Sequence, residues 1–433
     1  MAQDDSWYPA PIAPELLAPV LAGLAHARTL PSQAYTSAEV LGWETEWFFA
    51  RSWVCAGRSA DLARAGDRRA VRVGSDGVLL VRGDDGALRG FFNACRHRGH
   101  ELLACGTTAP GRVIRCPYHA WVYRLDGSLR AAPRFPELDP ADPVREGLIP
   151  TRVAEWHGWV FVNASGDVSD LAEHVGNLDA LLTPYQPGRL VPGATFEYVV
   201  QANWKLVVEN YQECYHCPGI HPELCRVTPY DSGERYTPTG RWVGGDMDLA
   251  DHAETMSLDG RSGGRPLPGL GAAARRRVVY VGLFPNLLVS LHPDYVMTHR
   301  IEPLAPDRTR IECQWLFDPE VAAAPAFDPA WAVDFWDLIN RQDWRACESV
   351  QRGVASRGYR QGPLTAHEET VHEFLGMVAR SYLTGSPGPP PSTGGSAACS
   401  GSSDPSVEGG IRGFVDGPAG APPGSTRSAS TGR

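Results

Sequence analysis

The chain has 433 residues and a formal net charge of −10, with 43% hydrophobic and 21% charged residues. This composition is ordinary for a globular enzyme, and the length predicts about three domains. The negative charge argues against nucleic acid or an anionic membrane as a partner. The acidic, proline-containing start predicts no signal peptide, and no apolar run is long enough to predict a membrane span. Ten cysteines spread along so long a chain indicate a reducing compartment, so we expect a cytoplasmic protein.

The first part of the chain predicts a helical start followed by short strands. Residues 1–47 form an N-terminal segment, with one helix expected over Pro14–His26 and a second beginning near Ser37. Across 48–165, apolar and polar residues alternate in short runs bounded by Gly and Asp. This pattern predicts a small antiparallel β domain, with strands within 69–74, 77–83, 88–94, 112–127 and 158–167.

The second part predicts longer elements and a single α+β domain over 166–384. Helical and strand-like periodicity alternate over 171–182 (helix), 194–216 (strand into helix), 278–304 and 309–317 (strands), and 331–356 and 367–383 (late amphipathic helices). Residues 385–433 are rich in Gly, Ser, Pro and Ala and contain few large apolar residues. A segment of that composition cannot bury enough apolar surface to fold, so we expect a disordered tail.

Four potential metal ligands lie in two short arms, Cys95-x-His97 and Cys116-x-x-His119. Thiolates hold an iron–sulfur core, and two imidazoles that replace two thiolates on one iron raise its potential. A structural zinc site is the rival interpretation, but zinc fingers usually pair Cys with Cys and His with His. Because each arm here is mixed, the pattern predicts a Rieske [2Fe–2S] centre held by Cys95, His97, Cys116 and His119.

A second group of potential ligands follows at Glu213, His216 and His221. If this segment continues the preceding helix, Glu213 and His216 share one face. Two imidazoles and one carboxylate form the facial triad of mononuclear Fe(II) oxygenases. Asp343, expected on a late helix, is the best source of the carboxylate, with Glu348 as a fallback. Taken alone, the two histidines could equally be a partly buried structural pair, but an electron-transfer centre needs a destination and this is the one candidate.

The order of these motifs resembles the catalytic α subunit of the Rieske non-haem iron oxygenases. The resemblance covers roughly residues 35–384 and rests on CRH…CPYH, NWK…EN and ECYHCPGIH followed by a late acid. It implies an all-β Rieske domain joined to a helix-grip (Bet v 1-like, START-like) catalytic domain with an antiparallel sheet and a long C-terminal helix. It also implies a [2Fe–2S] cluster, a mononuclear Fe(II), O₂ as co-substrate, and electrons from NAD(P)H through a separate reductase.

Members of this family are often homotrimers, in which the cluster of one subunit supplies the mononuclear iron of its neighbour. In ring-hydroxylating members an aspartate bridges the first histidine ligand to a cluster histidine across the interface. Glu213 stands at the matching position, so the resemblance implies a bridge from His216 through Glu213 to His119 of the neighbouring subunit. The glutamate is longer by one methylene, which changes the geometry of such a bridge.

The sequence around the iron ligands most resembles the branch that oxidises quaternary ammonium compounds, the glycine betaine, stachydrine and carnitine oxygenases. This implies hydroxylation of an N-methyl group and release of formaldehyde. A quaternary ammonium offers no hydrogen-bond donor, so aromatic faces should bind it, with Trp204, Tyr280, Phe284 and Trp315 as candidates. The alternatives are a ring-hydroxylating or natural-product-tailoring Rieske oxygenase and, more remotely, a non-enzymatic iron–sulfur or zinc protein.

Two further motifs are interpreted as incidental. Cys214-x-x-Cys217 lacks the βαβ context of a redox pair. The glycine-rich run that begins at Gly269 follows no predicted strand, so it lacks the context of a dinucleotide-binding fingerprint. We therefore expect no nicotinamide, flavin or ferredoxin module in this chain, in agreement with a separate reductase.

Overall fold

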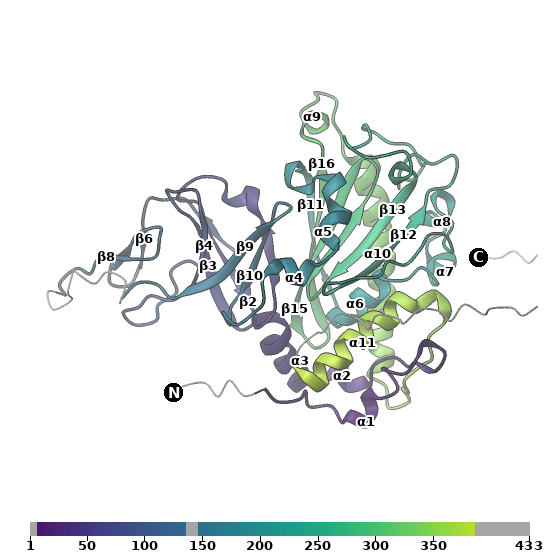
Figure 1. The fold of residues 1–433 in the computed structure, drawn as a ribbon, viewed down its shortest axis with the longest axis horizontal. Coiled ribbons are helices and arrows are strands. Elements are labelled where there is room, and N and C mark those ends of the chain that lie inside the picture. Colours follow the sequence, from purple (N-terminus) through teal and green to yellow (C-terminus); the bar gives the residue numbers. More distant parts are fainter. Residues whose placement is uncertain (1–6, 136–145, 386–433) are drawn as a thin grey trace, which may run out of the picture. The chain divides into compact units, whose positions relative to one another are not determined.

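The computed structural model describes residues 7–135 and 146–385, so most of the predicted tail lies outside the described residues. The first region contains a seven-stranded antiparallel sheet in the order β1-β10-β9-β4-β3-β2-β5 and a three-stranded sheet, β6-β7-β8. Both are drawn in Figure 1. The strands are β1 (Val54–Arg58), β2 (Arg68–Val73), β3 (Asp76–Arg82), β4 (Leu88–Phe92), β5 (Thr108–Ala109), β6 (Ile114–Arg115), β7 (Val122–Tyr123), β8 (Leu129–Ala131), β9 (Pro150–Trp156) and β10 (Trp159–Asn163).

A small apolar core joins these two sheets. Leu79, Val81 and Phe91 from the large sheet cluster with Ile114 and Tyr123 from the small one, and all five are buried. Period-2 alternation puts these side chains on one face of each strand, which explains why the sequence pattern identified the sheets. The antiparallel β domain is therefore confirmed.

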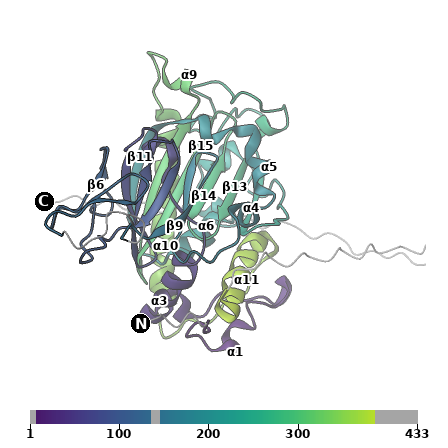
Figure 2. The same cartoon turned by 60° about the vertical axis from the view of Figure 1, so that its left-hand side comes forward.

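The second region is built on a six-stranded antiparallel sheet in the order β11-β16-β15-β14-β13-β12. Its strands are β11 (Val191–Val200), β12 (Trp242–Asp248), β13 (Arg277–Leu283), β14 (Leu287–Leu291), β15 (Tyr295–Ala305) and β16 (Arg308–Phe317). The long helix α10 (Ala330–Val354) contacts β11, and α11 (Glu369–Thr384) contacts β12. Figures 1 and 2 show both helices beside this sheet. The predicted catalytic-domain fold, an antiparallel sheet with a long C-terminal helix, is confirmed.

Two expected helices are interrupted. The stretch Pro14–His26 contains only α1 (Pro14–Leu17) and the short turn η1 (Leu24–His26), because Pro19 lacks the N–H that continues a helix. The stretch 171–182 divides into α4 (Leu171–Val175) and α5 (Leu178–Leu182) at Gly176, whose φ of 52° lies in the left-handed region.

The remaining helices are short and connect these larger elements. Ser37 caps α3, as expected from its position before the apolar run, and α3 passes directly into the π-helical turn η2. The elements are α2 (Ser32–Thr36), α3 (Ala38–Glu44), η2 (Thr45–Ala50), η3 (Ser59–Leu62), η4 (Thr183–Tyr185), η5 (Pro187–Arg189), α6 (Trp204–Tyr211), α7 (Cys217–Ile220), α8 (Leu224–Val227), η6 (Ala274–Arg276), α9 (Pro319–Ala322) and η7 (Ala366–Glu368). Within 7–135 and 146–385, no helix combines the length and apolar character needed to cross a bilayer.

Helix α6, which leads to the predicted iron ligands, is anchored by the chain's one lysine. Lys205 is fully buried and its Nζ lies 2.6 Å from Glu44 Oε1. Glu44 also accepts hydrogen bonds from Trp204 Nε1 at 2.8 Å and from the Tyr382 hydroxyl. A buried carboxylate with three donors satisfies its lone pairs without water. This cluster therefore ties α3, α6 and α11 together at one point.

Candidate active site and metal centres

The four predicted cluster ligands lie in two tight loops at one end of the β domain. Cys95 and His97 follow β4, where Cys95 N donates to His100 O and Gly99 N donates to Cys95 O. Cys116 and His119 lie between β6 and β7 in a loop of the same kind. Both thiols are buried, whereas the two histidines are half-buried. The structure thus brings the two arms together at strand ends, as the spacing predicted.

The surroundings of these loops fit an iron–sulfur cluster. The rings of His97 and His119 have centroids 4.6 Å apart, and His97 stacks on Trp121 at 5.0 Å. Nδ1 of His97 is buried and has no hydrogen-bond partner within the described residues, which is expected of an atom that binds iron. The hydroxyl of Tyr123 lies 3.2 Å from Cys95 Sγ. Two thiols, an unpartnered imidazole nitrogen and a hydroxyl donor to sulfur form a suitable donor set.

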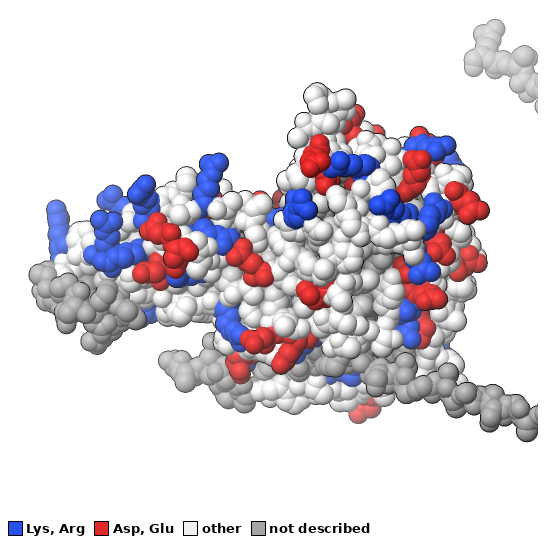
Figure 3. All heavy atoms as spheres, turned by 45° about the horizontal axis from the view of Figure 1, so that its top comes forward, with Lys and Arg blue, Asp and Glu red and all other residues white. Residues whose placement is uncertain are grey.

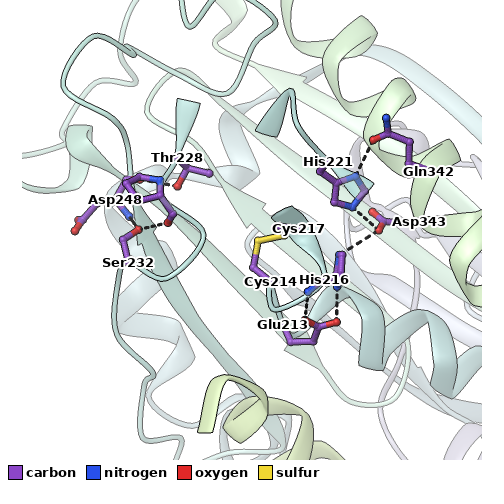
Figure 4. Close-up of a disulfide and its surroundings, with 11 residues drawn as sticks. Glu213, Cys214, His216, Cys217, His221, Thr228, Ser232, Asp248, Gln342 and Asp343 are labelled. Atoms are coloured by element: carbon purple, nitrogen blue, oxygen red, sulfur yellow. Dashed lines mark hydrogen bonds and ion pairs between the residues drawn. A yellow bond between two sulfur atoms is a disulfide. The ribbon is translucent and has the colours of Figure 1, made fainter. Parts of the chain in front are cut away.

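The second predicted site also assembles, from two distant parts of the chain. His216 and His221 lie on either side of the short helix α7, and Asp343 lies in the middle of α10. Asp343 Oδ1 is 2.8 Å from His221 Nε2 and 3.5 Å from His216 Nε2. One ligand atom from each residue lies within 4.8 Å of the others, the spacing of a metal site (Figure 4). The fallback, Glu348, lies elsewhere and accepts a hydrogen bond from Gln201 N.

The hydrogen bonds on the far side of each imidazole indicate a cation at this point. His221 Nδ1 lies 2.7 Å from Gln342 Oε1, and His216 Nδ1 contacts Glu213 Oε1. Because both partners are acceptors, each Nδ1 carries the proton and each Nε2 presents a lone pair. The Nε2 lone pairs of both histidines then face one oxygen of the Asp343 carboxylate. These lone pairs repel one another unless a metal ion or a proton lies between them. These residues therefore fit a mononuclear metal.

Glu213 and His216 meet without sharing a helix. Helix α6 ends at Tyr211, so the expected continuation of the helix through Glu213 is wrong. Glu213 Oε2 instead accepts the His216 backbone N–H at 3.2 Å, and its other oxygen contacts the imidazole. Without a metal ion, burial disfavours the imidazolium, but hydrogen bonds to Asp343 and Glu213 outweigh it and raise the pKa of His216 to about 9, so a proton then lies between Nε2 and Asp343 where the metal would bind. This carboxylate thus fixes both the backbone and the ring of the first histidine.

A disulfide encloses the same histidine. The interpretation of Cys214-x-x-Cys217 as incidental is wrong, because the two cysteines are bonded to each other on either side of His216, with a Cα–Cα distance of 4.9 Å (Figure 4). The four-residue turn they close begins one residue after Glu213. The pair adds a covalent constraint to the turn that carries His216 and helps to replace the helix that ends at Tyr211.

A cavity of about 310 Å³ opens beside these ligands and is walled by aromatic rings. The rings follow one another in contact: Trp336 and Tyr280 have centroids 6.3 Å apart, Tyr280 and Tyr211 5.9 Å, Tyr211 and His299 5.9 Å, and His299 and Trp344 6.1 Å. Burial lowers the pKa of His299 to about 4, so this imidazole is neutral near pH 7. The wall combines residues from β13, β15, α6 and α10.

Only one of the four aromatic residues predicted to bind substrate lies in this wall. Tyr280 is in it, whereas Trp204 belongs to the Glu44 cluster and Phe284 packs against Phe48 in the core. Trp315 is fully buried against Phe196. The sequence missed Tyr211, Trp336 and Trp344, because aromatic residues on helices are equally frequent in a core, and only packing decides which ones face a cavity.

The cavity is also strongly acidic. Of the described residues that line it, only Arg235 is a lysine or arginine. The guanidinium of Arg235 is held by Glu373 and by Glu369, whose Oε2 lies 3.2 Å from Nε. Six carboxylates line the same space, of which Asp246 is paired with Arg277 and Glu369 with Arg235: Glu213, Asp231, Glu234, Asp246, Asp343 and Glu369. Such a lining attracts a cation and disfavours an anion.

Comparison with known proteins identifies both domains. Residues 52–151 match the Rieske [2Fe-2S] domain, and residues 187–384 match the catalytic domain of the ring-hydroxylating alpha subunit. The glycine betaine monooxygenase oxygenase subunit of Chromohalobacter salexigens is 30% identical over 393 residues, which cover 82% of this chain and 86% of that protein. The carnitine monooxygenase oxygenase subunit of Escherichia coli is 31% identical over 371 residues, with 82% and 94% covered.

Solved structures show the same architecture. A quaternary ammonium Rieske monooxygenase in complex with L-carnitine has a TM-score of 0.69 and 26% identity, covering 86% of this chain and 99% of that one. Naphthalene 1,2-dioxygenase from Rhodococcus has a TM-score of 0.70 at 20% identity, covering 86% and 98%, which supports the fold alone.

The chain belongs to the Rieske oxygenases with a ring-hydroxylating-type catalytic domain, and it is an oxidoreductase. Within that class its relatives include oxygenase subunits of monooxygenases for glycine betaine and carnitine. The cofactors of this class are a [2Fe–2S] cluster in the Rieske domain and a mononuclear iron in the catalytic domain. Both predicted cofactors are thereby confirmed.

Proposed function

We propose that the protein removes a methyl group oxidatively from a quaternary ammonium compound. In this proposal Cys95, His97, Cys116 and His119 hold the [2Fe–2S] cluster, while His216, His221 and Asp343 hold the iron. The observation that carries the substrate class is the cavity beside Asp343: aromatic faces bind a quaternary ammonium, and carboxylates attract it. The substrates named for the similar glycine betaine and carnitine enzymes belong to this class.

The overall reaction balances with one O₂ for each methyl group. One oxygen atom enters an N-methyl C–H bond, and the other leaves as water after uptake of two electrons and two protons. The resulting hemiaminal collapses to formaldehyde, the tertiary amine and a proton. The bound iron supplies oxygen activation, and the cluster supplies electrons that we expect to come from NAD(P)H through a separate reductase.

The protein's own residues position the substrate and the ligands in this reaction. Tyr211, Tyr280 and Trp336 offer ring faces to the ammonium, each contact contributing about 0.5–2 kcal/mol. Because cation–π attraction has little directionality about the nitrogen, the cavity shape selects which methyl group points toward Asp343. Gln342 and Glu213 keep the two imidazoles in the tautomer that leaves each Nε2 free.

We also propose a homotrimer in which Glu213 connects His216 to His119 of the next subunit. Exposed arginines lie on the cluster loops and on the β6–β8 sheet: Arg96, Arg98, Arg112, Arg115, Arg124 and Arg130. Figure 3 shows basic side chains gathered at that end of the Rieske domain. Tyr118, 53% exposed, lies against His119 with ring centroids 3.7 Å apart.

The acidic rim of the cavity complements that surface. Asp231 and Glu234 are exposed there, and Tyr215, 55% exposed, stacks on His367. A basic surface on one subunit that fits an acidic surface on the next is a head-to-tail contact, which closes into a ring if the rotation allows. Glu213 lies within the acidic surface, so this contact would bring it to a cluster histidine.

Formaldehyde release tests the proposed reaction. The cluster- and iron-loaded enzyme, supplied with a surrogate reductase and NADH, should convert a quaternary amine to one equivalent each of formaldehyde and tertiary amine per O₂ consumed. A panel containing choline, glycine betaine, carnitine and tetramethylammonium covers the charge types. If every member of the panel leaves O₂ consumption unchanged, demethylation is wrong, and the same assay with aromatic substrates then tests the ring-hydroxylating alternative. Zinc without acid-labile sulfide would contradict an oxygenase altogether.

A further inference from the structure

The Cys214–Cys217 disulfide is connected to both histidines of the proposed iron site. His216 lies inside the turn that the bond closes, as Figure 4 shows. Cys217 N donates to Cys214 O at 3.0 Å within this turn, and Cys217 O accepts the His221 N–H at 2.8 Å. The cross-linked pair therefore lies on the stretch of backbone that sets the spacing of the two imidazoles.

The same turn also positions Glu213, the residue directly before Cys214. One oxygen of Glu213 accepts the His216 backbone N–H at 3.2 Å, and the other contacts the His216 imidazole. Helix α6 ends at Tyr211 and α7 begins at Cys217, so neither helix spans the residues between them. A change in the shape of the turn would therefore move the His216 ring relative to the carboxylate that orients it.

The disulfide has a local role and adds little to the stability of the whole fold. A cross-link stabilises a protein mainly by restricting its unfolded chain, and the gain is smallest when the closed loop is short. This loop has a sequence separation of three. The other cysteines that the structure describes are not joined to one another: Cys55, Cys95, Cys105, Cys116, Cys225, Cys313 and Cys347. The chain thus forms this bond at the iron ligands and not as a general means of stabilisation.

The disulfide lies where a reductant in solution can reach it. Both cysteines line the cavity of about 310 Å³, and Tyr215, which lies between them in the chain, is 55% exposed. Cys214 is half-buried, whereas Cys217 is only 2% exposed. Access decides which sulfur of a disulfide is attacked. We therefore expect an incoming thiolate to reach Cys214 Sγ first.

Resting on the iron site of the proposed function, we propose that Cys214 and Cys217 are a redox-sensitive positioning pair that controls how tightly His216 and His221 hold iron. A thiolate of a dithiol reductant attacks Cys214 Sγ, the S–S bond breaks, and Cys217 leaves as a thiolate that takes up a proton. The second thiolate of the reductant then displaces Cys214, which takes up the other proton. The dithiol is oxidised to a disulfide, and the two electrons it gives up leave the protein with two thiols.

Reduction opens the turn without touching a proposed ligand of either metal. Once the cross-link is lost, Glu213 and His216 move more independently, so the imidazole is held less firmly toward the iron. Loss of a group that orients a metal ligand typically costs 10–100-fold in metal affinity. The cluster loops lie after β4 and between β6 and β7, so their metal should be unaffected.

The rate of iron release tests this inference without any substrate. The unaltered protein, loaded with cluster and Fe(II), is compared before and after reduction with dithiothreitol, which is removed anaerobically before the protein is reloaded. Capture of Fe(II) by ferrozine should be about tenfold faster for the reduced form, while the visible absorption of the cluster stays the same. Alkylation followed by mass spectrometry of the peptide around His216 reports the thiol state of each sample.

Two variants assign the effect to this pair. The double variant Cys214→Ser, Cys217→Ser cannot form the bond, so it should release Fe(II) at the fast rate both before and after treatment with dithiothreitol. Cys225→Ser is the matched control, because it removes a half-buried thiol of the neighbouring helix α8 that is not cross-linked. This control should keep the slow rate when oxidised and the fast rate when reduced.

The outcomes separate this inference from the proposed function. A reduced unaltered protein that releases Fe(II) within twofold of the oxidised rate overturns the inference and leaves the iron site standing, and that result needs no variant to fold. A bond that dithiothreitol does not reduce, or an acceleration by dithiothreitol that persists in the double variant, also overturns it. If the oxidised protein binds no Fe(II) beyond its cluster, the proposed iron site itself fails.

Discussion

The two metal sites of this protein are built in opposite ways. The proposed cluster ligands all come from residues 95–119, in two loops closed by their own backbone hydrogen bonds over a small core. The proposed iron ligands come from a turn after α6 and from the middle of α10, and the two imidazoles among them are oriented by Glu213 and Gln342. A locally encoded site depends on few residues, whereas the iron site depends on packing between distant elements. The two sites should therefore respond differently to substitution.

Replacement of Asp343, the ligand farthest along the chain, should show most clearly that the iron site can be lost while the cluster remains. Asp343→Ala removes the carboxylate between His216 and His221, so turnover should fall at least about a hundredfold through lost iron, since even residues that only orient ligands cost 10–100-fold. The cluster's visible absorption should remain, because none of its ligands touches α10. Glu348→Ala, five residues along the same helix, is the control and should keep its activity. Retained turnover in the Asp343 variant would show that another residue supplies the third ligand.

Substitution of Glu213 tests whether the two sites work as a pair between subunits. Glu213→Gln keeps an acceptor for His216 but loses the charge of the proposed bridge to His119. Transfer of an electron from the reduced cluster to the iron should slow by roughly 10–100-fold, while both metals remain bound. Stopped-flow oxidation of the prereduced enzyme by O₂ with substrate measures this step. Unchanged cluster oxidation, with iron content also unchanged, would remove Glu213 from the electron path.

The same contrast explains how much the sequence revealed. Cys95, His97, Cys116 and His119 could be predicted as a group because short spacing within two hairpin loops is visible in the sequence itself. His216 and His221 could be predicted for a similar reason, and Asp343 because a metal needs an acid and α10 offers one with helical periodicity around it; the structure places these three side chains together. No sequence pattern indicated a role for Gln342, because its contact with His221 depends on how α10 packs against the segment that carries His216 and His221.

The cavity was the least predictable part. Trp204, Phe284 and Trp315 are as aromatic as Trp336 and Trp344, yet burial in the core separates the first three from the substrate. The end of α6 at Tyr211 and the Cys214–Cys217 bond arise from the turn that brings His216 to α10. Such features depend on contacts between distant segments, which periodicity does not encode.

Helix α6 carries a buried carboxyl group, Glu209, that should make the free energy of unfolding depend on pH. Burial raises the pKa of Glu209 to about 8, although Tyr35 donates to its Oε1 at 2.9 Å. With an unfolded pKa near 4.5, the native state holds this proton and the unfolded state releases it first. The free energy of unfolding should therefore fall as pH rises from 4.5 to 8, by an amount on the order of 3–5 kcal/mol.

Urea unfolding of the unaltered protein and of the variants Glu209→Gln and Glu197→Gln at several pH values measures this dependence. Glu209→Gln resembles the protonated form and keeps an acceptor for Tyr35, so its stability should decline less between pH 5 and pH 8 than that of the unaltered protein. Glu197→Gln, on the exposed part of β11, is the matched control and should reproduce the original slope. Parallel curves for Glu209→Gln and the unaltered protein would mean that Glu209 ionises normally in the fold.

The smallest expected effect is on the cluster itself. The Tyr123 hydroxyl accepts Arg96 N–H at 3.0 Å and lies 3.2 Å from Cys95 Sγ, which as a cluster thiolate can only accept. Burial raises the pKa of Tyr123, so the hydroxyl keeps its proton and donates a hydrogen bond to sulfur.

Tyr123→Phe removes this hydrogen bond and leaves more electron density on the cluster, so the reduction potential of the cluster should fall by some tens of mV. A redox titration monitored by circular dichroism measures the shift. Tyr359→Phe is the control, because that hydroxyl contacts Thr29 and the Leu30 carbonyl and no cluster residue. The iron site should keep its affinity for iron and for substrate, because the tyrosine acts through one bond within a locally encoded loop. A potential equal to that of the unaltered protein would show that solvent, and not this hydroxyl, sets the charge on the sulfur.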